Sequence, residues 1–211
     1  MSVGVLSREL LSDRVYAVIR SSIVNGEREP GDRLIESEIA RRLGTSLSPV
    51  RDALKRLSHD GLVMTAPRRG SYVTAISSEE FETARQLRAV LEQIGARAAV
   101  AIVTQSDLDH LRSITAQMRH AVARGDSGEC RGLDMEFHTY VIGIGKRAIL
   151  DRVWAALEPL LVSQRAIGDA SYDGDPEQIV QWHEDLIDTL ESGDADAAGT
   201  AFYVHAAGQL A

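Results

Sequence analysis

Three histidines and one aspartate in the second half of the chain have the types and spacing of a metal-binding set. Asp134 and His138 are four residues apart, so on a helix their side chains share one face about one turn apart. His183 and His205 flank a turn at residues 193–194. They are about ten and twelve residues from that turn, roughly 15 and 17 Å along a helix, so an antiparallel helix pair would bring both imidazoles level.

Three imidazoles and a carboxylate suit Zn²⁺, Ni²⁺, Mn²⁺ or a similar divalent ion, with water or a ligand completing the shell. A lone helical histidine is more often a core or surface residue than a ligand, and spacing alone leaves both interpretations open here. We interpret His110, His120 and His59 as ordinary core or surface residues. Cys130 is the only cysteine, which excludes an intrachain disulfide and a Cys-rich zinc site.

The elements that must position this set are helical. From residue 77 the sequence shows long helical periods with short connections, which predicts an antiparallel six-helix bundle. Asp134 and His138 then lie on the third of these helices, and His183 and His205 lie on the last two. The expected helices span residues 78–103, 106–124, 127–143, 146–168, 176–191 and 194–209.

The first 76 residues have a different plan. The sequence predicts helices over residues 7–24 and 35–43 and a third helix ending near Asp60-Gly61, with Ser46 or Ser48 as its cap and Pro49 in its first turn. Two β-prone runs, residues 62–65 and 71–74, then form a hairpin with a basic tip. Three helices and a hairpin are the plan of a winged helix-turn-helix, so the whole chain is expected to be mainly α.

Charge separates the same two parts. Residues 1–76 carry 12 Lys+Arg and 9 Asp+Glu, a net charge of +3, whereas residues 77–211 carry 11 and 22, a net charge of −11. With 44% hydrophobic and 26% charged residues, the composition excludes a disordered or collagen-like chain. No apolar run approaches the roughly 18 residues of a membrane span, and the N-terminus lacks a signal-peptide core, so we expect a cytoplasmic protein.

The basic residues of the first part gather where a winged helix-turn-helix meets DNA. The start of its third helix would face base edges in the major groove, while the second helix and the hairpin tip would meet phosphates. Each arginine by itself is better explained as part of a solvated face, but the set converges on one surface, which favours DNA binding. The expected DNA-binding residues are Arg41, Arg42, Ser46, Leu47, Ser48, Arg51, Arg68 and Arg69.

The runs from Arg33 to Ala40 and from Leu43 to Leu57, with Asp60-Gly61-Leu62-Val63 and Arg69 to Val73, resemble the GntR family of bacterial transcription regulators. The family usually has Arg where this chain has Leu47. Leucine can touch a thymine methyl but cannot make the bidentate guanine contact of arginine. A long basic or polar residue is also frequent in the family where this chain has Ser37. The resemblance implies DNA binding, and the two departures at Ser37 and Leu47 imply altered or weakened base readout.

The segments Leu133 to His138 and Trp182 to Asp194, with the late His205, resemble the FCD ligand-sensing domain that accompanies many such regulators, in its shorter VanR-like six-helix form. The resemblance implies that Asp134 and the three histidines hold a divalent metal. It also implies that Arg88, in the run Leu87 to Glu92, anchors a small carboxylate effector. A surface ion pair between Arg88 and Glu92 is the alternative.

Together these features predict a DNA-binding domain over residues 1–76 and a sensing domain over residues 77–211. The leading hypothesis is a homodimeric, ligand-responsive repressor that binds an inverted-repeat operator in double-stranded DNA and a small organic acid beside its metal. A metalloenzyme tethered to DNA is an alternative, disfavoured because the sequence has neither a paired Glu-x-x-His pattern nor an HExxH segment. A regulator with an empty or purely structural site is another.

Overall fold

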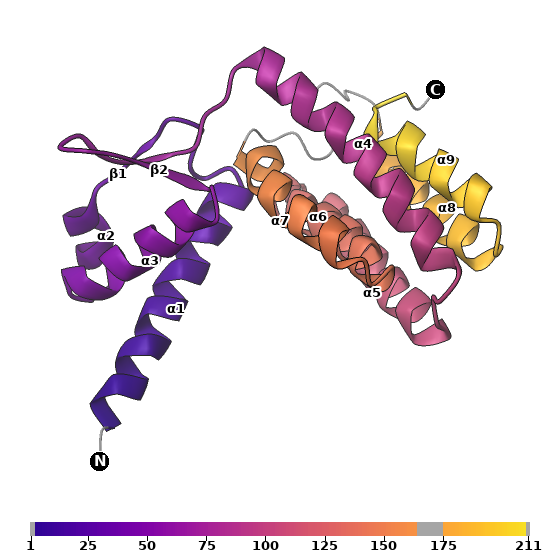
Figure 1. The fold of residues 1–211 in the computed structure, drawn as a ribbon. Helices are drawn as coiled ribbons and strands as arrows, with labels where there is room; N and C mark the ends of the chain where they lie inside the picture. Colours follow the sequence, from indigo (N-terminus) through magenta and orange to yellow (C-terminus); the bar gives the residue numbers. More distant parts are fainter. Residues whose placement is uncertain (1–2, 164–174, 210–211) are drawn as a thin grey trace.

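The computed structural model describes residues 3–163 and 175–209, which form a small N-terminal unit beside a helical bundle (Figure 1). The described residues are mainly helical, as the sequence predicts. The N-terminal unit contains helices α1 (Val3–Val24), α2 (Glu36–Arg42) and α3 (Leu47–His59) with strands β1 (Arg33–Leu34), β2 (Val63–Ala66) and β3 (Gly70–Val73). The bundle contains α4 (Ser78–Val100), α5 (Gln105–Ala123), α6 (Ser127–Ile144), α7 (Ala148–Ser163), α8 (Pro176–Glu191) and α9 (Ala195–Ala206).

Helix α3 is amphipathic and buries one face against α1 and α2. Val50, Ala53 and Leu57 are fully buried on that face. Ser46 occupies the N-cap position with an extended backbone, although its side chain makes no capping hydrogen bond. Pro49 lies in the first turn, where its missing N–H costs no helical hydrogen bond. The N-terminus of α3 therefore stays exposed while its body anchors the unit.

The sheet has one strand more than the sequence predicts. Its order is β1-β3-β2, and both pairings are antiparallel. Arg33 and Leu34, which lie between the first two predicted helices, pair with Tyr72 and Ser71 of β3. Such pairing joins segments far apart in the sequence, so local residue patterns do not reveal it. The hairpin tip uses left-handed backbone at Arg68 (φ 63°) and Gly70 (φ 105°), which turns the chain sharply and leaves the arginines exposed.

The bundle follows the predicted helices with small shifts at their ends. Helices α4 and α5 begin with reciprocal capping boxes, Ser77 with Glu80 and Thr104 with Asp107, which explains their sharp starts. Helix α4 ends at Val100 rather than at residue 103. The predicted extension of α7 to residue 168 lies outside the described residues.

The two units share one buried cluster at their junction. Val15 and Ile19 of α1 belong to the same hydrophobic cluster as Trp154 and Leu161 of α7. Arg20 of α1 also pairs with Glu158 of α7 at 2.6 Å. Helix α1 is therefore packed against the bundle as well as against α3, so it can connect events in the bundle to the helix-turn-helix.

Candidate functional site

The predicted metal-binding set comes together in the interior of the bundle. Asp134 and His138 of α6 meet His183 of α8 and His205 of α9, and one ligand atom from each lies within 4.8 Å of the others. The aspartate and the first two histidines are buried, and His205 is partly exposed. Centroids of the three imidazole rings are 4.8 to 5.3 Å apart. The structure thus places side chains from three helices where a single ion could contact them all.

Several nitrogen and oxygen atoms in this cluster are buried without a hydrogen-bond partner. They include Oδ2 of Asp134, Nε2 of both His138 and His183, and Nδ1 of His205. Unsatisfied buried polar atoms are costly, and several converging on one point are unusual for a cluster that only supports the fold. In His183 the other nitrogen, Nδ1, lies 2.7 Å from the carbonyl oxygen of Ile179, which leaves Nε2 to face Asp134 at 3.1 Å. These donors fit a divalent ion.

The protonation of the cluster also suits metal binding. Burial lowers the pKa of His205 well below its ordinary value, and the neighbouring imidazoles lower it further. Burial likewise lowers the pKa of His138, against the opposing charge of Glu92. Burial alone would raise the pKa of the Asp134 carboxyl. The neighbouring imidazoles and Arg88 outweigh the effect of burial, so the pKa of this carboxyl is lowered. Neutral imidazoles beside an ionised carboxylate are the forms that ligate metals.

Arg88 lies beside this cluster and is 5% exposed, so the interpretation of Arg88 and Glu92 as a surface pair is wrong. Its Nε lies 2.5 Å from Glu92 Oε1, and its Nη2 lies 3.6 Å from Asp134 Oδ2. The other oxygen of Glu92 lies 2.7 Å from Nδ1 of His138. Glu92 was not among the site residues predicted from the sequence. The signal that could have found it was an Arg and a Glu four residues apart on the α4 face that also carries the buried Ala84, Ala89 and Ala96.

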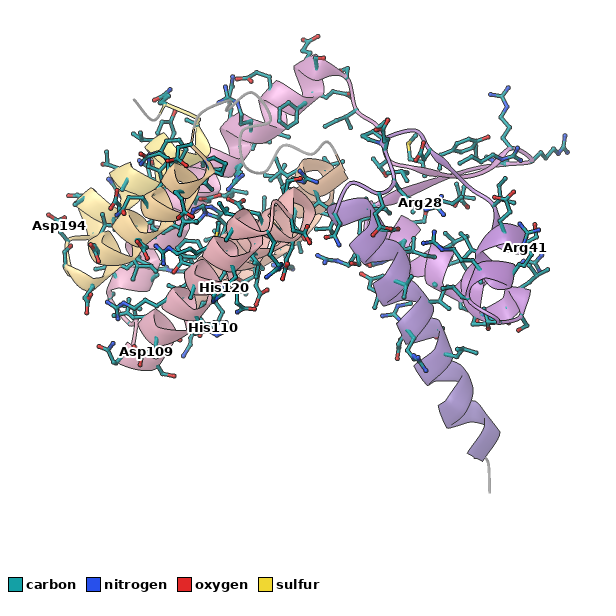
Figure 2. The ribbon with its side chains drawn as sticks, turned by 180° about the vertical axis from the view of Figure 1, so that it is seen from behind. Arg28, Arg41, Asp109, His110, His120 and Asp194 are labelled. Carbon is teal, nitrogen blue, oxygen red and sulfur yellow. The ribbon has the colours of Figure 1, made fainter. Side chains whose placement is uncertain are left out.

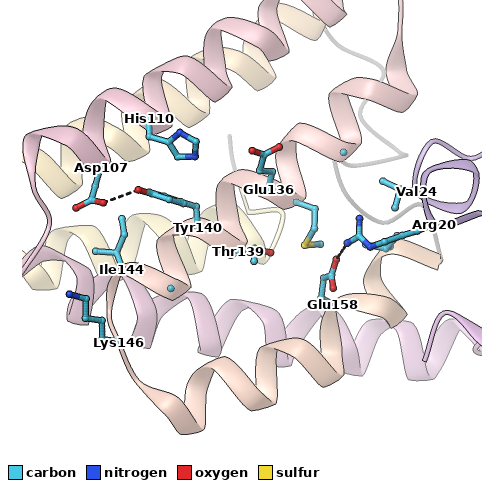
Figure 3. Close-up of a pocket in the computed structure, with 14 residues that line it drawn as sticks. Arg20, Val24, Asp107, His110, Glu136, Thr139, Tyr140, Ile144, Lys146 and Glu158 are labelled. Atoms are coloured by element: carbon cyan, nitrogen blue, oxygen red, sulfur yellow. Dashed lines mark hydrogen bonds and ion pairs between the residues drawn. The ribbon is translucent and has the colours of Figure 1, made fainter. Parts of the chain in front are cut away.

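The remaining histidines lie outside the cluster. His110 and His120 are exposed on α5 (Figure 2), and His59 is exposed at the end of α3. His110 contacts the ring of Tyr140, with centroids 4.3 Å apart, and lines an open groove of about 660 Å³ between α1, α5, α6 and α7 (Figure 3). None of the predicted metal, effector or DNA residues lines that groove. It is a separate feature at the junction of the two units.

The predicted DNA-contacting residues are accessible in the N-terminal unit. Leu47 stands exposed at the start of α3, and Arg41 projects at the end of the molecule opposite Asp194 (Figure 2). Arg51 is exposed and pairs with Glu36 of α2 through a 2.7 Å contact between its Nε and Oε2. Arg42 and the tip residues Arg68 and Arg69 are also exposed. The surface therefore combines the start of α3, the end of α2 and the hairpin tip, with Ser46 and Ser48 beside Leu47.

No helix among the described residues is both long and apolar enough to cross a membrane.

Comparison with family models matches residues 11–73 to the bacterial regulatory proteins of the gntR family and residues 83–208 to the FCD domain. The two matched segments correspond to the N-terminal unit and to the bundle.

Named relatives agree with these matches. The chain is 30% identical over 197 residues to the HTH-type transcriptional repressor RspR of Escherichia coli K12, covering 92% of this chain and 85% of that protein. It is also 30% identical over 207 residues to a probable D-xylose utilization operon transcriptional repressor of Paenarthrobacter nicotinovorans, covering 97% and 89%.

Solved structures show the same fold. The structure of E. coli McbR/YncC matches with a TM-score of 0.78 at 22% identity and 94% coverage of both chains. A putative GntR transcriptional regulator of Rhodococcus sp. RHA1 matches with a TM-score of 0.76 at the same identity and coverage. At this identity the matches establish the architecture alone.

Proposed function

The chain belongs to the gntR family of bacterial regulatory proteins and carries an FCD domain, and from this premise we propose that it is a dimeric, ligand-responsive repressor controlled by a small organic acid. Its family and named relatives are transcriptional regulators and not enzymes, which rules against the tethered metalloenzyme. In this proposal residues 1–76 bind an inverted-repeat operator and residues 77–211 sense the acid. The observation that carries the proposal is the buried cluster of Asp134 and three histidines.

Asp134, His138, His183 and His205 would hold a divalent ion, with Zn²⁺, Ni²⁺ and Mn²⁺ as the candidates. Such an ion supplies open coordination positions that accept carboxylate oxygens. The partnerless atoms described above support this assignment, because a metal would satisfy them together. A purely structural ion would use the same residues, so the choice between sensing and structure rests on whether an acid binds.

Charge in the bundle interior favours an acidic effector. With neutral imidazoles, the charges of Arg88, Glu92 and Asp134 sum to −1, and a divalent ion would bring the sum to +1. A buried unbalanced charge is costly, so a monocarboxylate would neutralise the site. Because Nε of Arg88 is already paired with Glu92, the Nη atoms of Arg88 would donate hydrogen bonds to the acid.

The DNA-binding part of the proposal rests on the exposed surface of the N-terminal unit. The start of α3, with Ser46, Leu47 and Ser48, would enter the major groove, and Arg51 would lie one turn further along it. The end of α2 and the hairpin tip would reach flanking phosphates. Because Arg51 is already paired with Glu36, DNA must compete with that carboxylate for the guanidinium.

Exposed apolar residues support a dimer. Leu87, Val90 and Ile94 follow one face of α4, and Ile149 and Val153 are exposed on the neighbouring α7, with Ile149 71% exposed. Apolar side chains grouped on adjacent helices mark an interaction surface. A second copy related by two-fold symmetry would cover this stripe and present two helix-turn-helix units to an inverted repeat.

Helix α6 offers a route between the two activities. It carries Asp134 and His138, and one turn earlier Arg131 donates to the carbonyl oxygen of Asn25 at the end of α1, with 2.9 Å between Nη2 and O. An acid that favours one position of α6 would therefore favour one placement of α1. A coupling of about 1 to 3 kcal/mol would change operator affinity roughly 5- to 150-fold.

The decisive experiment measures, for one preparation of the protein, the binding of small acids and the binding of operator DNA. Calorimetry with the Zn²⁺-loaded protein and a panel of small carboxylates should find a binder, whereas neutral and cationic analogues should not bind. Operator fragments selected from random DNA should then be bound with a different affinity when that acid is present. If no acid binds, the site is structural or empty. If an acid binds but leaves operator affinity unchanged, the proposed sensing mechanism is wrong.

A further inference from the structure

Glu92 is a buried carboxylate that enters the scheme above only through its charge and its contact with Arg88, and its contact with His138 has no role there. It lies on α4 and is 1% exposed. Its two oxygens face different partners: Oε1 accepts a hydrogen bond from Nε of Arg88 at 2.5 Å, whereas Oε2 lies at an ion-pair distance of 2.7 Å from Nδ1 of His138 without the alignment of a hydrogen bond. A fully buried carboxylate is costly unless its oxygens have partners, and a proton on Nδ1 of His138 is the partner that this close approach offers to Oε2.

We propose that Glu92 is a positioning residue that holds the His138 ring with its Nε2 directed at the metal-binding cluster. The inference rests on the metal site proposed above and adds a residue to it from a helix that supplies no ligand. An N–H at Nδ1 facing the carboxylate leaves Nε2 unprotonated, which is the form that binds a metal. Outer partners of this kind orient ligating histidines and make them more basic.

The neighbouring histidine shows the same arrangement with a different partner. His183 has its Nδ1 2.7 Å from the carbonyl oxygen of Ile179, and its Nε2 faces Asp134. The backbone of α8 thus orients His183, whereas His138 depends on a side chain from another helix. His138 Nε2 lies 3.8 Å from Asp134 Oδ1, so both imidazoles direct Nε2 toward the same carboxylate.

Replacing Glu92 by glutamine separates this role from simple packing. Glutamine has nearly the same shape but only one acceptor oxygen, and Glu92 faces two N–H groups. If the amide oxygen faces Arg88, its NH₂ group faces Nδ1 of His138 and favours the tautomer with the proton on Nε2. If the oxygen faces His138, the NH₂ group meets the Arg88 donor. Either outcome disturbs the ligand or its neighbour without removing volume.

The competing explanation is that Glu92 contributes only negative charge. The double variant Arg88→Met, Glu92→Met removes one charge of each sign, keeps the net charge of the cluster and leaves Nδ1 of His138 without an acceptor at position 92. If Glu92 acted through charge alone, this double variant would bind metal as the wild type does. If Glu92 positions His138, the loss caused by Glu92→Gln remains in the double variant.

The test is a Zn²⁺ titration against a competing chelator for the wild type, Glu92→Gln, Arg88→Met and the double variant. The matched control is Glu82→Gln, which removes the charge of a partly exposed, Arg-paired carboxylate on the same helix. We expect Glu92→Gln and the double variant to bind Zn²⁺ about 10- to 100-fold more weakly. We expect Glu82→Gln to be unchanged. Wild-type affinity in Glu92→Gln or in the double variant would overturn the inference.

A second measurement does not depend on how the variants fold. Long-range ¹H–¹⁵N spectra of the metal-free wild type report the tautomer of each imidazole. We expect the proton of His138 on Nδ1, and a proton on Nε2 would overturn the inference. A wild type that binds no Zn²⁺ would instead refute the metal site, while the spectrum would still decide whether Glu92 orients His138.

Discussion

The ligand atoms of the proposed metal site come from three helices, so an ion bound there would join α6, α8 and α9. Such an ion binds the folded bundle and not the unfolded chain, and it therefore adds its binding free energy to stability. The stability gained from the ion depends on individual residues, because each ligand side chain can be replaced without changing the helices.

Metal removal is therefore expected to destabilise the protein. Zn²⁺ at about 100 times its Kd should add about 2.7 kcal/mol to the free energy of unfolding, and a chelator should reverse the gain. His138→Ala, His183→Ala and His205→Ala should each abolish the Zn²⁺-dependent rise in melting temperature. His110→Ala and His120→Ala are the controls and should keep it. Scanning calorimetry checks this, and five variants that behave alike would show that the site is misplaced.

The thiol of Cys130 is expected to react slowly with alkylating reagents. Burial, followed by the charge of Asp134, raises the pKa of the Cys130 thiol to about 11. Because the thiolate is the reactive form, only about one thiol in a thousand is ionised at pH 8. Alkylation by iodoacetamide at pH 8 should be slower in the native protein than in urea by on the order of a hundredfold. Cys130→Ser gives the background rate, and equal native and unfolded rates would contradict the expectation.

Among the elements, the hairpin tip is expected to act through phosphates. The double variant Arg68→Ala, Arg69→Ala should weaken operator binding and lower its salt dependence by about one unit of slope for each phosphate that the variant no longer neutralises. Arg112→Ala, which removes a partly exposed arginine from α5, is the control. Fluorescence anisotropy across a salt series measures the slope. A folded double variant with unchanged affinity and slope would exclude the tip from the DNA interface.

The contact of α6 with α1 is a second element-scale feature. A Cβ atom at Gly128 would lie 2.8 Å from the carbonyl oxygen of Asn25, closer than a real contact allows, whereas at Gly143 of the same helix it would meet nothing within 4 Å. Gly128→Ala should therefore force the two helices apart and cost about 1 to 3 kcal/mol of stability. Gly143→Ala should cost nothing, because alanine favours a helix.

Urea denaturation compares these two glycine variants. Gly128→Ala should also reduce the effect of the acid on operator affinity, since it alters the contact through which α6 reaches α1. Equal stability of the two variants would show that the close approach at Asn25 is relaxed at little cost.

At the scale of the whole molecule, the apolar stripe on α4 and α7 is expected to be a dimer interface. Ile94→Glu places a charge within this stripe, where burial at an interface without a partner is costly. This variant should sediment as a monomer at micromolar concentration and bind an inverted-repeat operator far more weakly. As a control, Gln117→Glu adds the same charge at an exposed position of α5, and this variant should remain dimeric. A monomeric wild type, free and on DNA, would refute the dimer.

Much of the molecule could be predicted from local pattern. The helices from α2 to α9 follow from apolar periodicity and end signals, such as Ser77 with Glu80 at the start of α4. The four candidate metal ligands could also be identified from spacing, because a separation of four residues and equal distances from one turn are geometric facts about helices. The resemblance to known regulators rested on the same stretches.

Tertiary structure decided what depends on contacts between distant segments. Strand β1 exists because β3 lies beside it. The side-chain types of Arg33 and Leu34 do not indicate this backbone pairing, so local sequence does not predict it. Glu92 acquires its place only when α4 packs on α6, which turns an ordinary helical Arg-Glu spacing into a buried link to His138. Residue type and spacing therefore determined which groups were available, and packing decided which of them are buried together, because burial depends on neighbours that local sequence does not specify.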